Sequence, residues 1–175
     1  MKTMLKGLLL AAALLMVAAR PAAAQSGFTV LGNVGFGLQH DTDFAETANG
    51  LAGPNIGAGV FLTPKIAVLG RMSGTMATFT GNVKQNAYVY GGTIQFWLNK
   101  WASVEAGAGY GHWTLPDFNE SGNGFGLLFA FEATVWQKGP HHIRAGFEYA
   151  PLFDTTNNFD IHNMGIVGGY QWVKK

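Results

Sequence analysis

Strict alternation of apolar residues with small or polar ones marks the stretch from Gly124 to Ala150. Alternation puts successive side chains on opposite faces, which is typical of a β-strand and not of a helix. Residues 137–140, which include a Gly-Pro pair, divide the stretch into two strands of a predicted hairpin. One face is large, aromatic and free of charge: Phe125, Leu127, Phe129, Phe131, Ala133, Val135, Ile143, Ala145, Phe147 and Tyr149. The other combines small residues with Glu132, Arg144 and Glu148, which favours a barrel wall with lipid outside and a narrow polar interior.

The same alternation recurs along the chain, so that eight segments can be marked. Besides the two arms of the hairpin they are residues 28–39, 55–62, 66–78, 87–98, 102–113 and 161–173. Most are close to the ~9–11 residues that a tilted strand needs to cross a bilayer. We therefore predict an all-β fold, an eight-stranded antiparallel transmembrane β-barrel in up-and-down order.

The predicted connections alternate between short and long. Residues 63–65, 99–101 and 137–140 form short turns, whereas residues 40–51, 81–85, 115–123 and 154–158 are mostly longer and polar. Short periplasmic turns and longer extracellular loops are typical of outer-membrane barrels. An even number of strands puts both termini on the short-turn, periplasmic side.

Charged residues follow this map. Acidic residues lie in or beside the predicted outer loops, with only Lys84 among them: Asp41, Asp43, Glu46, Asp117, Glu120, Asp154 and Asp160. Lysines lie at the short turns or the chain end: Lys65, Lys100, Lys138, Lys174 and Lys175. The remaining charges fall on the inner face: Arg71, Glu105, Glu132, Arg144 and Glu148. None is left for the lipid face, where Arg or Lys at mid-bilayer would cost about 2–4 kcal/mol.

The inner charges are the main candidate site. Glu132 and Arg144 flank one short turn on the same face, so they are predicted to be directly opposite or diagonal neighbours within reach of each other. Arg71, Glu105 and Glu148 are expected to extend the network. Because removal of one buried charge leaves its partner uncompensated, we interpret the set as a salt-bridge plug that closes the lumen. The alternative is a gate or a proton-accessible path through the plug.

Aromatic residues near the strand ends predict an interfacial girdle. Amphipathic rings collect where the bilayer meets water. The predicted girdle consists of Trp97, Trp101, Trp113, Trp136, Tyr170 and Trp172, although Trp97 and Trp136 have inward parity.

The N-terminus has the pattern of a secretory signal peptide, predicted over residues 1–24. Lys2 and Lys6 precede an apolar run, Gly7–Ala19, and Ala22-Ala23-Ala24 forms a small-residue cleavage site. The mature barrel would be residues 25–175, in the bacterial outer membrane. Cleavage would remove three of the 11 basic residues and none of the ten acidic ones. The mature chain is thus slightly acidic, and no nucleic-acid partner is expected.

At the level of pattern, over essentially the whole mature chain, the sequence resembles the small eight-stranded outer-membrane barrels of the OmpA transmembrane-domain and OmpX type. The resemblance implies an interior filled by side chains. It also implies contact with outer-membrane lipid and lipopolysaccharide, insertion by the barrel-insertion machinery, and a monomer. In that family the insertion machinery commonly reads a terminal aromatic residue, whereas here Tyr170 and Trp172 are followed by Val173, Lys174 and Lys175.

The expected role is non-enzymatic, structural or surface-interacting through acidic polar outer loops, with an extracellular ligand that the sequence does not identify. A narrow channel for small or hydrophobic solutes is a second hypothesis, and a soluble lipocalin-like carrier is a third. A lipid deacylase is a fourth, because His112 and Thr114 share the outer face at the spacing such enzymes use. No carboxylate on that face is predicted to orient His112. No cofactor motif or metal-ligand spacing is present, so neither group is expected.

Overall fold

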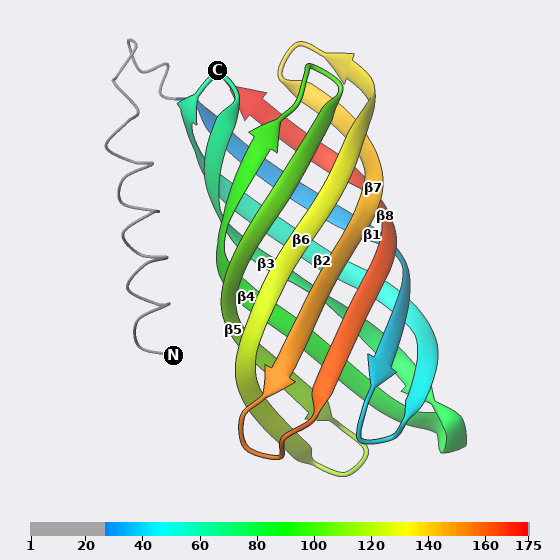
Figure 1. Ribbon diagram of the computed structural model, residues 1–175. Coiled ribbons are helices and arrows are strands. Elements are labelled where there is room, and N and C mark those ends of the chain that lie inside the picture. The colour runs from blue at the N-terminus through cyan, green and yellow to red at the C-terminus, as the bar shows by residue number, and fades with distance from the viewer. Residues whose placement is uncertain (1–26, 175) are drawn as a thin grey trace, which may run out of the picture.

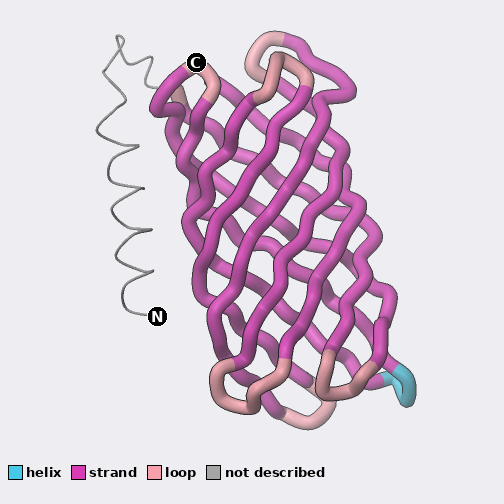
Figure 2. The backbone as a smooth tube through the Cα atoms, in the orientation of Figure 1, coloured by secondary structure: helices cyan, strands magenta, loops and turns pink. Residues whose placement is uncertain are grey.

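The computed structural model describes residues 27–174, which form a closed barrel of eight strands in sequence order (Figures 1 and 2). The strands are β1 (Phe28–Asp41), β2 (Glu46–Thr63), β3 (Ile66–Phe79), β4 (Val83–Trp97), β5 (Ala102–Leu115), β6 (Glu120–Lys138), β7 (His141–Asp154) and β8 (Asp160–Lys174), with one 3-10 turn, η1 (Thr80–Asn82). The predicted fold class and strand order are confirmed. The predicted signal peptide lies outside the described residues.

Pairing between the first and last strands closes the sheet. The β1–β8 register is continuous from Phe28 opposite Lys174 to Asp41 opposite Ile161. Because every strand of the closed barrel is paired with two neighbours, no edge is left to pair with another chain. The start of β1 and the end of β8 lie at the same end of the barrel, which we call the terminal end (Figure 1).

The opposite end, which we call the acidic end, differs from the sequence prediction. Its connections are residues 42–45, 80–82, 116–119 and 155–159, only slightly longer than residues 64–65, 98–101 and 139–140 at the terminal end. The prediction of long loops was wrong, because paired strands include most of those residues. In β2, for example, Thr47 is exposed and Ala48 buried, so alternation continues through a polar stretch.

The outer face carries an apolar zone, which we call the lipid band. In β1 the outward side chains from Phe28 to Leu38 are apolar or glycine. At ~3.3 Å per residue and a tilt of ~40°, this length covers about 25 Å of membrane normal, the height of the apolar band of outer-membrane barrels. Beyond it, toward the acidic end, outward residues form a polar collar: His40, Thr47, Asn49, Thr78, Asn86, His112, Thr114, Ser121, Asn123 and His162.

Buried side chains form layers inside the barrel. An apolar layer lies toward the acidic end: Ala87, Val89, Trp113, Leu115, Leu128, Ala150, Leu152 and Ile161. A second apolar cluster lies toward the terminal end: Leu31, Phe61, Ala67, Leu69, Trp97 and Val173. The charged inner residues occupy the space between them. Within residues 27–174, no helix is both long enough and apolar enough to span a membrane.

Candidate functional site: the interior charge network

The five inner charges project into the barrel from four strands. Arg71 comes from β3, Glu105 from β5, Glu132 from β6, and Arg144 and Glu148 from β7. None is more than 6% exposed. Alternation explains this placement, because each residue has the parity opposite to the lipid-facing side chains of its strand. We call this set the interior charge network.

Arg71 on β3 pairs with two carboxylates across the lumen, one from β5 and one from β7. Its Nε lies 3.1 Å from Glu105 Oε1, and its Nη2 lies 3.0 Å from Glu148 Oε1. The inward-facing Gly57 leaves room for this side chain, because a Cβ built there would lie 2.6 Å from Arg71 Cδ. A single guanidinium thus compensates two carboxylates.

Arg144 pairs with the partner that the sequence predicts. Its Nη1 lies 2.7 Å from Glu132 Oε2. Its Nη2 also donates to Ser103 Oγ at 2.6 Å and to the carbonyl oxygen of Glu132 at 3.0 Å. In the β6–β7 register Glu132 is opposite Gly146, so Arg144 is its diagonal neighbour.

Side-chain amides join the two ion-paired groups. The Asn33 Nδ2 atom donates to Glu132 Oε1 and, at 2.7 Å, to Glu148 Oε1. Glu148 Oε2 accepts from Asn55 Nδ2 at 2.7 Å and from Ser73 Oγ at 2.6 Å. Sequence reasoning did not assign these polar residues to the network, although inward parity indicates them. They satisfy the carboxylate oxygens that the guanidinium groups leave open.

The space beside Glu148 in the network is almost completely filled. The cavity beside Glu148, bordered also by Asn55, Ser73 and Asn163, has a volume of about 10 Å³. That is at the lower limit for holding one water molecule. The geometry is therefore that of a tightly packed ionic layer between two apolar layers.

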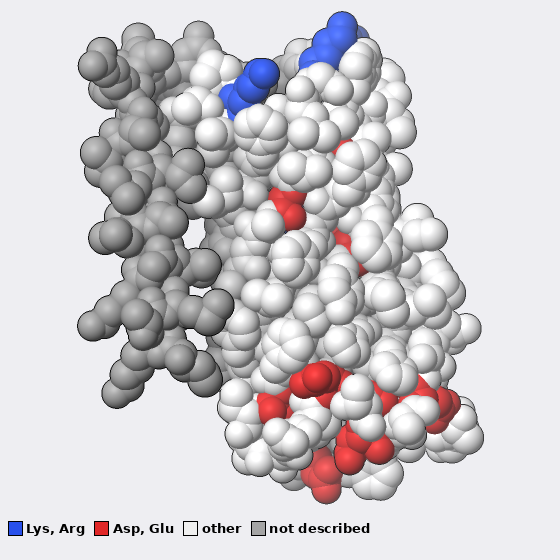
Figure 3. Space-filling model, viewed as in Figure 1, with Lys and Arg blue, Asp and Glu red and all other residues white. Residues whose placement is uncertain are grey.

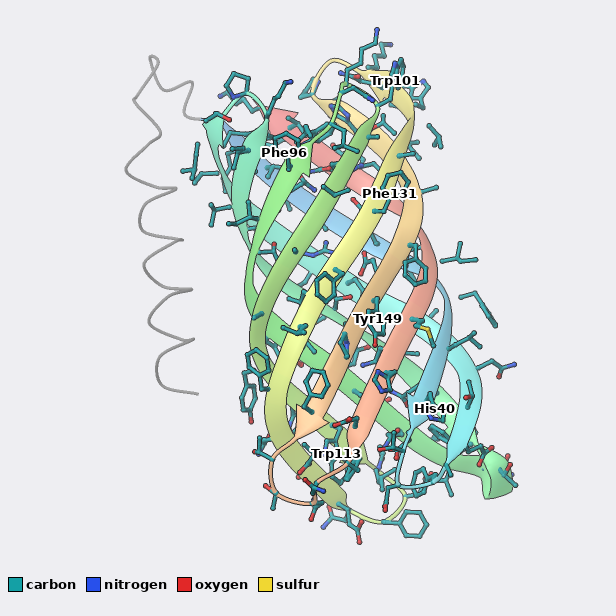
Figure 4. The ribbon with its side chains drawn as sticks, viewed as in Figure 1. His40, Phe96, Trp101, Trp113, Phe131 and Tyr149 are labelled. Atoms are coloured by element: carbon teal, nitrogen blue, oxygen red, sulfur yellow. The ribbon has the colours of Figure 1, made fainter. Side chains whose placement is uncertain are left out.

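Two of the predicted girdle tryptophans lie inside the barrel, so their assignment was wrong. Trp97 is 3% exposed, its Nε1 donates to Gln95 Oε1 at 3.0 Å, and Arg144 Cζ lies 4.9 Å from its ring centroid. Trp113 is 5% exposed and donates from Nε1 to Asp154 Oδ2 at 2.6 Å (Figure 4). Both have inward parity, which was already noted for Trp97, and parity predicts their position better than the interfacial preference of tryptophan.

The other predicted girdle residues face outward at the terminal end. Trp101, Trp136 and Tyr170 are exposed, and Trp172 is half-buried. Trp136 reaches the outer face against its simple parity because a register shift between Thr134 and Trp136 reverses the alternation. Figure 4 shows Trp101 and Trp113 at opposite ends of the barrel.

Two acidic residues predicted for the outer loops are turned into the barrel mouth. Asp41 is 1% exposed and accepts from Gln85 Nε2 at 2.6 Å. Asp154 is also buried and binds Trp113. The other acids of this group lie at the acidic end, and red side chains gather there in Figure 3.

His112 and Thr114 lie in the polar collar on β5, as predicted from their parity. The His112 Nδ1 atom lies 2.7 Å from Asn123 Oδ1, and its ring stacks on Tyr110. Thr114 Oγ1 accepts a bond of 3.4 Å from Asn86. The partner of His112 is thus an amide. In the described part of the chain, no group of three or more His, Cys, Asp or Glu residues is arranged to hold a metal ion.

Comparison with known proteins identifies the family. The family described as "Outer membrane protein beta-barrel domain" matches residues 9–172. The chain belongs to this family of bacterial outer-membrane barrels. None of the curated protein sequences compared with the chain matches it.

Solved structures of two surface proteins share the fold. The attachment invasion locus protein Ail of Yersinia pestis aligns with a TM-score of 0.58 at 15% identity, over 85% of this chain and 100% of its own. Neisserial surface protein A aligns with a TM-score of 0.58 at 15% identity, over 83% of this chain and 96% of its own. A second Ail structure, in complex with the heparin analogue sucrose octasulfate, has a TM-score of 0.53 at 14% identity, over 85% of this chain and 100% of its own.

Proposed function

We propose that the protein is a non-enzymatic outer-membrane barrel with a closed lumen, whose role is structural or surface-interacting. The observation that carries the closed lumen is the interior charge network, packed so that only about 10 Å³ remains beside Glu148. The apolar layers on either side of the network add further barriers to water and ions.

The acidic end is the proposed contact surface. We assign the terminal end, where β1 begins, β8 ends and the connections are slightly shorter, to the periplasm, so that the acidic end extends beyond the outer leaflet. Exposed or half-buried carboxylates lie there on or beside the turns: Asp43, Glu46, Asp117, Glu120 and Asp160. The names of the two similar proteins refer to attachment and to the cell surface, in keeping with such a role.

The remaining expected partners follow from the same assignment. The lipid band contacts outer-membrane lipid, and the polar collar meets the headgroups of lipopolysaccharide. We expect export through a cleaved signal peptide over residues 1–24, followed by insertion as a monomer by the barrel-insertion machinery. Outward Tyr170 and Trp172 on the last strand are the aromatic residues available for recognition by that machinery.

Conductance across a planar lipid bilayer tests the closed lumen. The inserted protein should show no steady current, with a wide bacterial porin as the positive control. A steady pore larger than a water molecule would contradict the proposal and support a narrow channel instead.

The deacylase and carrier hypotheses make separate predictions. A lipid deacylase would need His112, so His112→Ala should leave the lipid composition of the host envelope unchanged if the protein is not an enzyme. A lipocalin-like carrier would turn its aromatic residues inward to hold a ligand. Phe125, Phe129 and Phe131 are instead 48%, 43% and 51% exposed on the outer face, which argues against a carrier.

A further inference from the structure

A second cavity lies at the terminal end of the barrel, separate from the interior charge network. Its volume is about 440 Å³, within the usual range of small-ligand sites, and it opens to solvent. Trp97 and His142 line its inner part, and Lys100, Gln137 and Lys174 line its outer part. We call it the terminal cavity.

The inner part of the terminal cavity is built from packed side chains. Trp97 and His142 are 3% and 5% exposed, and their rings meet edge to face with centroids 5.6 Å apart. The Arg144 guanidinium stacks on Trp97 at 4.9 Å, and a backbone bond of 2.8 Å from Val173 to Pro140 holds the wall. An indole and an imidazole of fixed orientation therefore face whatever enters.

Charge at this end has one sign. Lys100 and Lys174 line the terminal cavity, and Lys65 and Lys138 lie on the same end of the barrel. Among the described residues, every carboxylate outside the interior charge network lies toward the acidic end. Figure 3 shows this separation, with blue side chains at the terminal end and red ones gathered at the other. The lysines at this end therefore attract anions, and none of the described carboxylates lies beside them.

We propose that the terminal cavity is a binding site for a small anion of the phosphate or carboxylate type, free or at the end of a larger periplasmic molecule. The ammonium groups of Lys100 and Lys174 and the amide of Gln137 supply donors for charge-assisted hydrogen bonds. The Trp97 ring offers an apolar surface to the rest of the ligand. Anion binding here does not depend on the surface role proposed for the acidic end, and only the periplasmic source of the ligand rests on the orientation proposed above.

Titration of the full mature chain in non-ionic detergent tests the proposal. Inorganic phosphate and acetate are added separately at constant ionic strength, maintained with sodium chloride. Binding is followed by tryptophan fluorescence and by titration calorimetry. We expect saturable binding, and loss of the fluorescence change in Trp97→Phe. Lys100→Gln/Lys174→Gln should weaken binding by about tenfold or more, the usual loss for charge-assisted hydrogen bonds.

The matched control is Lys84→Gln, compared with Lys100→Gln alone: each removes one lysine charge, but Lys84 lies at the acidic end, so Lys84→Gln should bind as the parent does. Saturation by both anions supports a general anion site, and saturation by one alone identifies that chemistry. The proposal would be overturned if neither phosphate nor acetate gave saturable binding, by fluorescence or by calorimetry. Equal weakening in the control and test variants would also overturn it, because general charge attraction would then explain the binding.

Discussion

The two faces of the barrel wall differ more than any other two regions of the molecule. The inner face holds Arg71, Arg144 and their three glutamate partners within a few ångströms of one another. The outer face of the lipid band carries large apolar side chains, up to 71% exposed at Ile166. Side chains of both kinds alternate residue by residue along each strand. Within the lipid band, the charged groups of the described residues are therefore found only on the inner face, so the effect of a charge depends on the parity of its position.

The largest expected effect is removal of a charge from the inner face. Arg71→Met leaves Glu105 and Glu148 without their shared cation, so the free energy of unfolding should fall by about 3–5 kcal/mol. Urea unfolding of the barrel refolded in lipid vesicles measures this. The matched variant Glu105→Gln leaves Arg71 paired with Glu148 and should cost only about 1 kcal/mol. A smaller loss in Arg71→Met than in Glu105→Gln would show that the network does not depend on the shared guanidinium.

The next effect is addition of a charge to the outer face. Ile166→Arg places a guanidinium against the acyl chains near mid-bilayer and should lower the free energy of unfolding by about 2–4 kcal/mol. Thr47→Arg makes a comparable change in the polar collar, where the expected cost is about 0–1 kcal/mol. The same vesicle-based unfolding assay compares them. Equal costs at the two positions would mean that the lipid band is misplaced.

The smallest expected effect is the replacement of a tryptophan, which we compare between the inner and the outer face. Trp113→Phe removes the N–H donor to Asp154 at the inner face and should cost about 1.5–3 kcal/mol, the value of a hydrogen bond to a charged group. Trp101 is exposed on the outer face with Lys100 Nζ 5.3 Å from its ring, and Trp101→Phe should cost less than about 1 kcal/mol. Equal losses of unfolding free energy in urea would show that the buried Trp113–Asp154 hydrogen bond adds no stability beyond that of the exposed indole.

Alternation was sufficient to predict the fold, because parity assigns each side chain to one face once a barrel is assumed. It placed all five charges of the interior network inside and Glu132 beside Arg144. The prediction was wrong where it relied on residue type instead of on parity. Trp97 and Trp113 were assigned to the girdle because tryptophan favours interfaces, and polar residues 46–51 were assigned to a loop although Ala48 still alternates with its neighbours.

Other features could not be predicted from local pattern. Trp136 faces outward only because β6 and β7 change register between Thr134 and Trp136, which depends on pairing across two strands. The amides that join the network depend on contacts between strands far apart in the sequence, such as Asn33 with Glu132 and Glu148. The terminal cavity combines residues from β4, β6, β7, β8 and two turns, so only the closed barrel brings them together.

The short turns at the acidic end affect how this surface can bind a partner. Because paired strands continue almost to the tip, few backbone torsions remain to be fixed on contact, and association would cost little ordering entropy. The same stiffness prevents the rim from wrapping around a partner of a different shape. A partner would therefore be selected by how well its shape fits a rigid surface. Only side chains such as the exposed Phe44 and Phe118 could adjust to it.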